Sequence, residues 1–165
     1  MNSPSTVEID EVRVRGEFTW TPFTVGDEQP CFQRLVRLRL NRGDCSHWGP
    51  AVYRWEGLVG SGEHEGRTGL YIGETKDLRA RINQYRKGTQ KKGNARVREE
   101  FPERGDIRLW VIEAATLSLS GPGLCVTYVQ HDFSDSYVRK LVESLLLCAQ
   151  RANEDSGYWV VNAAG

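Results

Sequence analysis

The sequence predicts an α+β fold in which a small central antiparallel β-sheet is flanked by helices. The first observation is a set of short apolar stretches with the length and alternation of strands, at 51–56, 70–73 and 107–114. The second is the glycine-rich, mixed-charge segment 57–67, which has the composition of a wide hairpin loop between two antiparallel strands. The third is a pair of stretches with helix start signals, at 75–87 and 135–152.

The first 50 residues are predicted to be an N-terminal extension of strands and loops, joined to a main domain at 51–165. Apolar and charged residues alternate over 7–15, aromatic residues gather at 18–24, and 41–50 is rich in turn residues. The stretch 32–40 fits either a strand or a helix, because its leucines recur at both spacings.

The predicted helix 75–87 is expected to begin at Thr75 as its N-cap, with Asp77 in the first turn, and to end at Gly88. The region from residue 76 to residue 98 has nine Lys or Arg and one acid, so it carries +8 while the whole chain is neutral. The basic residues are Lys76, Arg79, Arg81, Arg86, Lys87, Lys91, Lys92, Arg96 and Arg98. A stripe of one sign predicts contact with a polyanion, whereas a solvated helix face, the alternative, usually mixes signs.

The remaining elements are less regular. A short helix is expected at 94–101, stopped before Pro102. The segment 116–133 is predicted to be an insertion with its own strand around 124–129, and 158–162 to be a last strand or an extended tail.

The long helix 135–152, capped by Ser134 or Asp135, carries an apolar stripe at helical spacing. The stripe, which is expected to be buried, consists of Val138, Leu141, Val142, Leu145, Leu146 and Ala149. Cys148 is expected to be a small core residue. Glu143 lies beside the stripe, so its carboxylate is expected to be partly buried and to need a cation, either an arginine or a metal ion.

Composition excludes several classes of protein. No apolar run approaches the roughly 18 residues that a membrane span needs, and residues 1–10 lack the pattern of a secretory signal, so we expect a cytoplasmic protein without membrane contact. The four cysteines are not spaced for a disulfide framework. Cys45 and His47 are close, but a zinc site needs two further ligands.

Four features occur in order along the chain. They are the tripeptide Ala51-Val52-Tyr53, the tripeptide Tyr71-Ile72-Gly73, Arg81 eight residues after Gly73, and Glu143 on the long helix. Over roughly residues 51–162 this set resembles the GIY-YIG nuclease family. The first motif departs from the family in its Ala and Val, the loop between the motifs is longer than in compact members, and Tyr85 stands where the family often has a histidine.

The resemblance implies a metal-dependent endonuclease. Its catalytic residues would be Tyr53, Tyr71, Arg81, Tyr85, Glu143 and Asn162. A single carboxylate with water and phosphate ligands suits Mg²⁺ (or Mn²⁺), so Glu143 would be the metal ligand, and Arg81 would hold the scissile phosphate. By resemblance Tyr53 is the better candidate for the general base or for the group that orients water. As a base it requires a cation such as Arg67 or Lys76 to lower its pKa from about 10.

Each of these residues also has a structural interpretation. The tyrosines could be strand aromatics, Gly73 a turn residue, and Arg81 the ion-pair partner of Glu143. Asn162 is expected to hydrogen-bond near the metal or the substrate, or otherwise to cap a turn.

Three functions remain open at this stage. The first is a DNA endonuclease of the restriction or the repair and mobile-element type, with residues 1–50 and 116–133 reading bases or forming a homodimer that cuts both strands. The second is a catalytically inactive nucleic-acid-binding module with the same fold. The third is a protein-binding domain, recognisable by an exposed patch among Trp20, Trp48, Trp55, Trp110 and Trp159.

Overall fold

The computed structural model describes residues 13–59, 63–87, 97, 106–123, 129–151 and 158–160. The strands and helices in chain order are β1 (Arg13–Glu17), β2 (Thr21–Pro22), α1 (Phe32–Arg37), the 3₁₀ turn η1 (Arg42–Asp44), β3 (Ala51–Leu58), β4 (Thr68–Thr75), α2 (Leu78–Lys87), β5 (Arg108–Ile112), β6 (Ala115–Ser120), β7 (Val129–His131), α4 (Ser136–Arg151) and β8 (Tyr158–Val160). The fold is α+β, as the sequence predicts.

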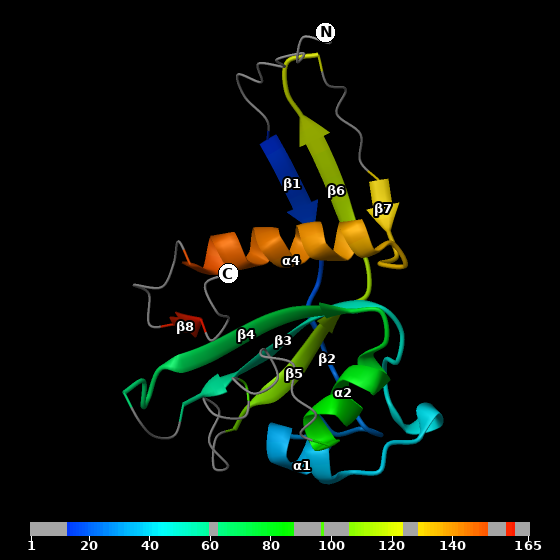
Figure 1. Ribbon diagram of the computed structural model, residues 1–165, viewed down its shortest axis with the longest axis vertical. Helices are drawn as coiled ribbons and strands as arrows, with labels where there is room; N and C mark the ends of the chain where they lie inside the picture. Colours follow the sequence, from blue (N-terminus) through cyan, green and yellow to red (C-terminus); the bar gives the residue numbers. More distant parts are fainter. Residues whose placement is uncertain are drawn as a thin grey trace, which may run out of the picture.

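Two sheets organise these elements (Figure 1). The larger sheet has the order β2-β5-β3-β4-β8 and is antiparallel except for the parallel pairing of β4 with β8. The smaller sheet, β1-β6-β7, is antiparallel throughout. The prediction of a small sheet flanked by helices is therefore confirmed, and a second sheet is added to it.

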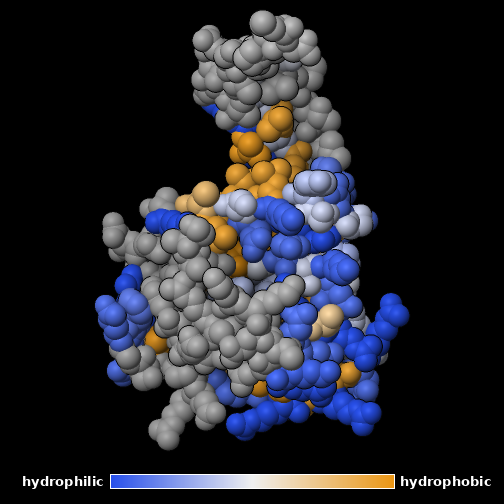
Figure 2. Space-filling model, in the orientation of Figure 1, coloured by the Kyte–Doolittle hydropathy of each residue, from blue (hydrophilic) through white to orange (hydrophobic). Residues whose placement is uncertain are grey.

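The helices cover both faces of the larger sheet. Side chains alternate along a strand, so Tyr53, Trp55 and Tyr71 point into one core, which α1 and α2 cover. Val52 and Ile72 point to the other face, where they pack against α4. Figure 1 shows α4 crossing between the two sheets, and Figure 2 shows apolar residues, in orange, gathered where the sheets meet.

Residues before position 50 contribute to the core and to both sheets. The ambiguous stretch 32–40 contains a helix, α1, and the buried side chains of Phe32 and Leu35, three residues apart, join the core around Trp55. β2 pairs with β5, and β1 pairs with β6. The first strand thus belongs to the same sheet as the segment expected to be an insertion.

The cap of α2 differs from the prediction. The Asp77 carboxylate accepts a hydrogen bond of 2.8 Å from the Ala80 backbone N–H, so Asp77 caps the helix. Thr75 is instead the last residue of β4, and its hydroxyl accepts a bond of 3.2 Å from the Asp77 N–H. The expected end at Gly88 lies outside the described residues.

The buried face of α4 is rotated from the predicted stripe. Val142 and Leu146 are buried, but Leu141 is 42% exposed, and Ala149 and Cys148 are exposed. The prediction that Leu141 and Ala149 are buried was wrong, because apolar residues occupy more of the helix surface than one face can bury. The cap is as predicted, since the Asp135 carboxylate accepts a hydrogen bond of 2.7 Å from the Tyr137 N–H.

Two further predicted elements lie partly outside the described residues. The segment expected to be an insertion contains β6 and β7, while 124–128, the centre of its expected strand, lies outside the described residues. Of the expected helix 94–101 only Val97 is described, and it is buried in the core. The described helices include none with the length and hydropathy to cross a membrane. Cys31, Cys45 and Cys148 are free thiols.

Candidate active site

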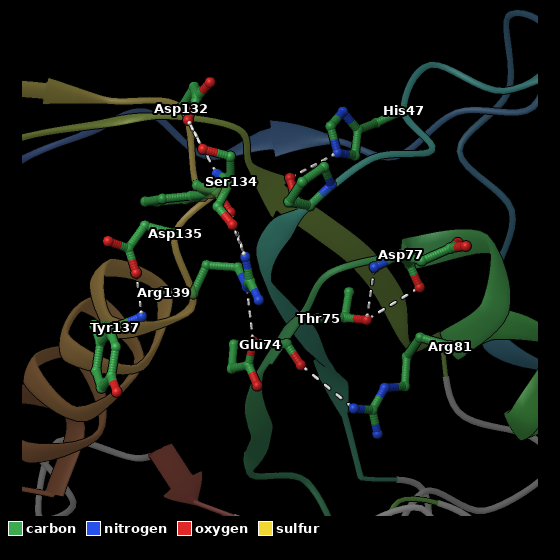
Figure 3. A network of polar contacts seen from close by, with 12 residues as sticks. His47, Glu74, Thr75, Asp77, Arg81, Asp132, Ser134, Asp135, Tyr137 and Arg139 are labelled. Atoms are coloured by element: carbon green, nitrogen blue, oxygen red, sulfur yellow. Dashed lines mark hydrogen bonds and ion pairs between the residues drawn. The ribbon is translucent and has the colours of Figure 1, made fainter.

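The predicted site residues approach one another at an edge of the larger sheet. β8 pairs with β4 only at 68–70, so no described strand adjoins β4 beyond Leu70 on that side. Around this edge, α2 and α4 reach β4 from opposite faces of the sheet. Figure 3 shows Arg81 of α2 and Arg139 of α4 pointing toward Glu74 from its two sides.

Three tyrosines lie together beneath the edge. The Tyr53 and Tyr85 hydroxyls are hydrogen-bonded at 3.0 Å, and the Tyr53 and Tyr71 ring centroids are 6.4 Å apart. Tyr53 and Tyr85 are each only 1% exposed, whereas Tyr71 is 8% exposed and is the nearest of the three to the surface. The sheet thus sets two tyrosines side by side, and α2 adds the third.

Gly73 makes room for this arrangement. The register of the two central strands places Gly73 opposite Tyr53. A Cβ atom at position 73 would lie 2.6 Å from the Tyr53 hydroxyl oxygen, closer than real contacts allow. The glycine of the second tripeptide is therefore required by the ring of the first, and not by a turn.

Arg81 supplies the positive charge of the site. Its guanidinium donates a hydrogen bond of 3.4 Å to the Glu74 carbonyl oxygen. Burial lowers the pKa of Arg81, but the neighbouring Tyr53, Tyr85 and Tyr71 raise it, and the net direction is upward. Arg81 is therefore a permanent cation beside all three phenols.

The phenols are neutral in this environment. Burial raises the pKa of Tyr53 well above its ordinary value, and the charge of Arg81 does not outweigh that effect. Burial likewise raises the pKa of Tyr85 and of Tyr71. The lowered Tyr53 pKa that a general base requires is thus absent from the structure as it stands.

Glu143 is a half-buried carboxylate on the α4 side of the edge. Burial first, and then the neighbouring Glu74 carboxylate, raise the pKa of Glu143 to about 7, while Arg81, a hydrogen bond with the Glu74 backbone and Lys140 oppose the rise. Glu143 also raises the pKa of Tyr71, so the two side chains are electrostatic neighbours. A cation bound beside a carboxylate with such a raised pKa would stabilise its ionised form.

An ion pair that the sequence did not predict joins α4 to β4 at this edge. Arg139 is 4% exposed, and its Nε lies 2.8 Å from Glu74 Oε2. Its guanidinium also donates to the carbonyl oxygens of Phe133 and Ser134, just before α4. The available signals were a basic residue inside the apolar stripe and an acid directly after the second tripeptide.

Glu143 has the character of a single-carboxylate metal ligand. The described part of the chain holds no group of three or more His, Cys, Asp or Glu side chains that could bind a metal ion. The Glu74 carboxylate is engaged by Arg139. A single carboxylate fits Mg²⁺, which keeps most of its water ligands and also binds the phosphate oxygens of a substrate. It does not fit structural zinc, which needs four protein ligands. Asn162 lies outside the described residues.

Apart from the half-buried Arg81, the described residues of the basic stripe are exposed. Lys76, Arg79, Arg86 and Lys87 are all exposed, on α2 or just before it. Figure 2 shows hydrophilic residues, in blue, over the lower part of the molecule where α2 lies. The rest of the predicted contacts, namely Lys91, Lys92, Arg96 and Arg98, lie outside the described residues.

The comparisons with known proteins leave the family as a proposal. No protein-family model matches the chain, and neither a curated protein nor a solved structure matches it.

Proposed function

We propose that the chain is a Mg²⁺-dependent endonuclease of the GIY-YIG type that hydrolyses DNA phosphodiester bonds. The observation that carries the proposal is the meeting of Arg81, Glu143 and three tyrosines at one edge of the sheet, from two strands and two helices. Phosphodiester hydrolysis needs a cation on the phosphoryl oxygens, a carboxylate for a metal ion and groups that orient water.

Each side chain receives a role from its position. Arg81 binds the scissile phosphate, because its planar guanidinium can pair with two phosphate oxygens at once. Glu143 holds the metal ion, and its side chain is half-buried and not enclosed by the core. Bound Mg²⁺ would supply neutralisation of the developing negative charge.

The three tyrosines are assigned the role of orienting water and substrate by hydrogen bonds. Because burial raises the pKa of all three phenols, each keeps its proton at neutral pH and can donate a hydrogen bond. Tyr71, the least buried, adjoins both Arg81 and Glu143 and is the best placed of the three to position water. Tyr53 and Tyr85 support it from below through their mutual hydrogen bond.

The substrate is taken to be duplex or branched DNA in the cytoplasm, cut by an enzyme of the restriction or the repair and mobile-element type. One active site per chain would require two copies for a cut through both strands, so a homodimer belongs to the proposal. The neutral phenols favour one alternative, a catalytically inactive nucleic-acid-binding module. A protein-binding domain is less favoured, since Trp20, Trp48, Trp55 and Trp110 are all at least half-buried and no exposed tryptophan patch forms among the described residues.

A plasmid assay tests the proposal. Supercoiled DNA is incubated with the protein in Mg²⁺ or in EDTA, and nicked and linear products are separated. We expect cleavage in Mg²⁺ only, and its loss in Arg81→Ala and in Glu143→Ala. Arg34→Ala is the matched control, because Arg34 is exposed and paired with Glu28 at 2.6 Å. Binding without cleavage would favour the inactive module, and absence of DNA binding at low salt would leave the protein-binding domain.

A further inference from the structure

We propose a second phosphate-binding site, in the cavity between the loop 42–49 and the start of α2. It would hold a backbone phosphate of the DNA that Arg81 engages, distinct from the scissile phosphate. The inference rests on the proposed function, because it assigns a subsite to the same substrate. Arg42 and Trp48, which lie before the resembling region, thereby gain a role.

The cavity has the size and charge for such a group. Its volume is about 320 Å³. The lining residues are Arg42, Trp48, Gly49, Lys76, Asp77 and Arg79. Three of them are cations, and the one carboxylate, that of Asp77, is engaged in capping α2. A concave site with three cations attracts an anion more strongly than a flat basic surface does.

Hydrogen bonds fix the walls of the cavity. The Leu78 backbone N–H donates to the carbonyl oxygens of Trp48 and Gly49, both at 3.2 Å, which joins the loop to the first residue of α2. The Trp48 indole N–H donates to the Arg42 carbonyl oxygen. The loop and the helix start therefore form one framework and not two independent surface segments.

Trp48 also places one of the cations. The Arg79 guanidinium lies 5.5 Å from the centroid of the indole ring, in cation–π geometry. Trp48 also packs against the buried core cluster to which Leu78 belongs. The exposed Arg79 side chain is thus held over the Trp48 ring, which itself packs on the core. Because Arg79 is already ordered, it loses less conformational entropy when it binds an anion.

α2 carries both Arg79, which lines the cavity, and Arg81, two residues further on. Residues two positions apart on a helix point to different sides, so the cavity and Arg81 offer positive charge on different sides of α2. A DNA duplex that covers the start of α2 can therefore meet Arg81 with one phosphate and the cavity with another.

Equilibrium binding separates this site from general electrostatics. A fluorescein-labelled 30-base-pair duplex is titrated in EDTA, at several salt concentrations, with the full-length protein and its variants. We expect Arg42→Gln and Arg79→Gln each to weaken binding about 3- to 10-fold and to lower the slope of log K against log salt by about 1. Arg42→Lys should recover most of the affinity. Arg34→Gln, with the same change in charge, should bind like the unmodified protein.

The outcomes distinguish the two proposals. Unchanged affinity and slope in both Arg42→Gln and Arg79→Gln, with melting temperatures preserved, would overturn the second site. An equal loss in Arg34→Gln would also overturn it, because the effect would then follow net charge. If the unmodified protein cuts no plasmid in Mg²⁺ but the binding changes appear, the second site stands and the nuclease proposal fails. If the duplex does not bind at low salt, both fail.

Discussion

The absence of a side chain at Gly73 leaves room for the ring of Tyr53 on the neighbouring strand. In Gly73→Ala the new Cβ would lie 2.6 Å from the Tyr53 hydroxyl oxygen and 2.7 Å from its ring carbon Cζ. Tyr53 is fully buried, so its ring cannot move without disturbing the hydrogen bond to Tyr85. We expect the free energy of unfolding to fall by about 1–3 kcal/mol in urea denaturation.

Gly43→Ala is the control for that substitution. No atom lies within 4 Å of a Cβ built on Gly43, so its stability should be close to that of the unmodified protein. Equal stability of the two variants would show that the Tyr53 ring has room to retreat.

Glu143 should make stability depend on pH in an unusual direction. Its pKa is raised from 4.5 to about 7 in the folded protein, so the folded state holds a proton that the unfolded chain has released. Stability therefore falls as pH rises from about 4.5 to about 7. Glu143→Gln removes this loss and should be more stable than the unmodified protein at pH 8, by about 1 kcal/mol after discounting for partial exposure.

The difference in unfolding free energy between Glu143→Gln and the unmodified protein reports on the Glu143 carboxylate alone, because all other titrating groups are shared. Urea denaturation at pH 4.5, 6 and 8 should show the stability difference growing with pH. A difference that is constant over this range would mean that Glu143 ionises with an ordinary pKa.

At the residue scale, the sequence predicted which side chains meet better than it predicted their pKa values. Tyr53, Tyr71, Arg81 and Glu143 could be selected because their order and spacing survive in the linear chain. The direction of the Tyr53 pKa could not be predicted, because it depends on complete burial, to which α1 contributes from outside the resembling region. The Arg139–Glu74 pair joins residues 65 positions apart, and no local pattern marks such a contact.

The start of α2 depends on one side chain. Asp77→Ala removes the carboxylate that accepts the Ala80 N–H, and the loss of an N-cap costs about 1 kcal/mol. Asp77→Asn is the matched variant, since an amide oxygen also caps a helix. Thermal unfolding followed by circular dichroism should rank Asp77→Asn above Asp77→Ala, and the reverse order would contradict the assigned cap.

The ion pair between Arg139 and Glu74 joins α4 to β4. Arg139→Met would leave a partly buried carboxylate unpaired and should destabilise the protein by about 3–5 kcal/mol. The double variant Arg139→Met/Glu74→Met has no unpaired charge there and should regain most of the loss. Urea denaturation of both single variants, Arg139→Met and Glu74→Met, and of the double variant completes a double-mutant cycle. A double variant no more stable than Arg139→Met would mean that the pair is not coupled.

At the element scale, the helices and strands of the main domain were predictable, but their faces were not. The periodicity of α4 identified a helix, yet the buried face centres on Arg139 and Val142 and leaves Leu141 half-exposed. Periodicity reports which residues are apolar, whereas the choice of face depends on the sheet that the helix meets. For the same reason, the helix at Phe32–Arg37 emerged from an ambiguous stretch only because its apolar side packs on Trp55 and Tyr85.

On the scale of the whole molecule, neutral net charge conceals a separation of charge. The sequence predicted this separation directly, since the stripe and its surroundings can be counted. The second sheet could not be predicted in this way, because β1 and β6 are about 100 residues apart in the chain and pair through backbone groups. Such distant pairings are fixed by the complete fold and leave little trace in a local sequence window.

The separation of charge leads to a prediction about binding. The isoelectric point is near 6.8, so the whole protein is slightly negative at pH 8. Binding to duplex DNA should nevertheless persist there, because arginine and lysine side chains are in general positively charged at pH 8. If the five described cations from Lys76 to Lys87 each neutralise one phosphate, log K should fall with log salt with a slope of about −4 to −5. Anisotropy titrations between pH 6 and pH 8 measure both quantities. A slope near −1, or binding that disappears as the net charge turns negative, would show that the stripe is an ordinary solvated surface.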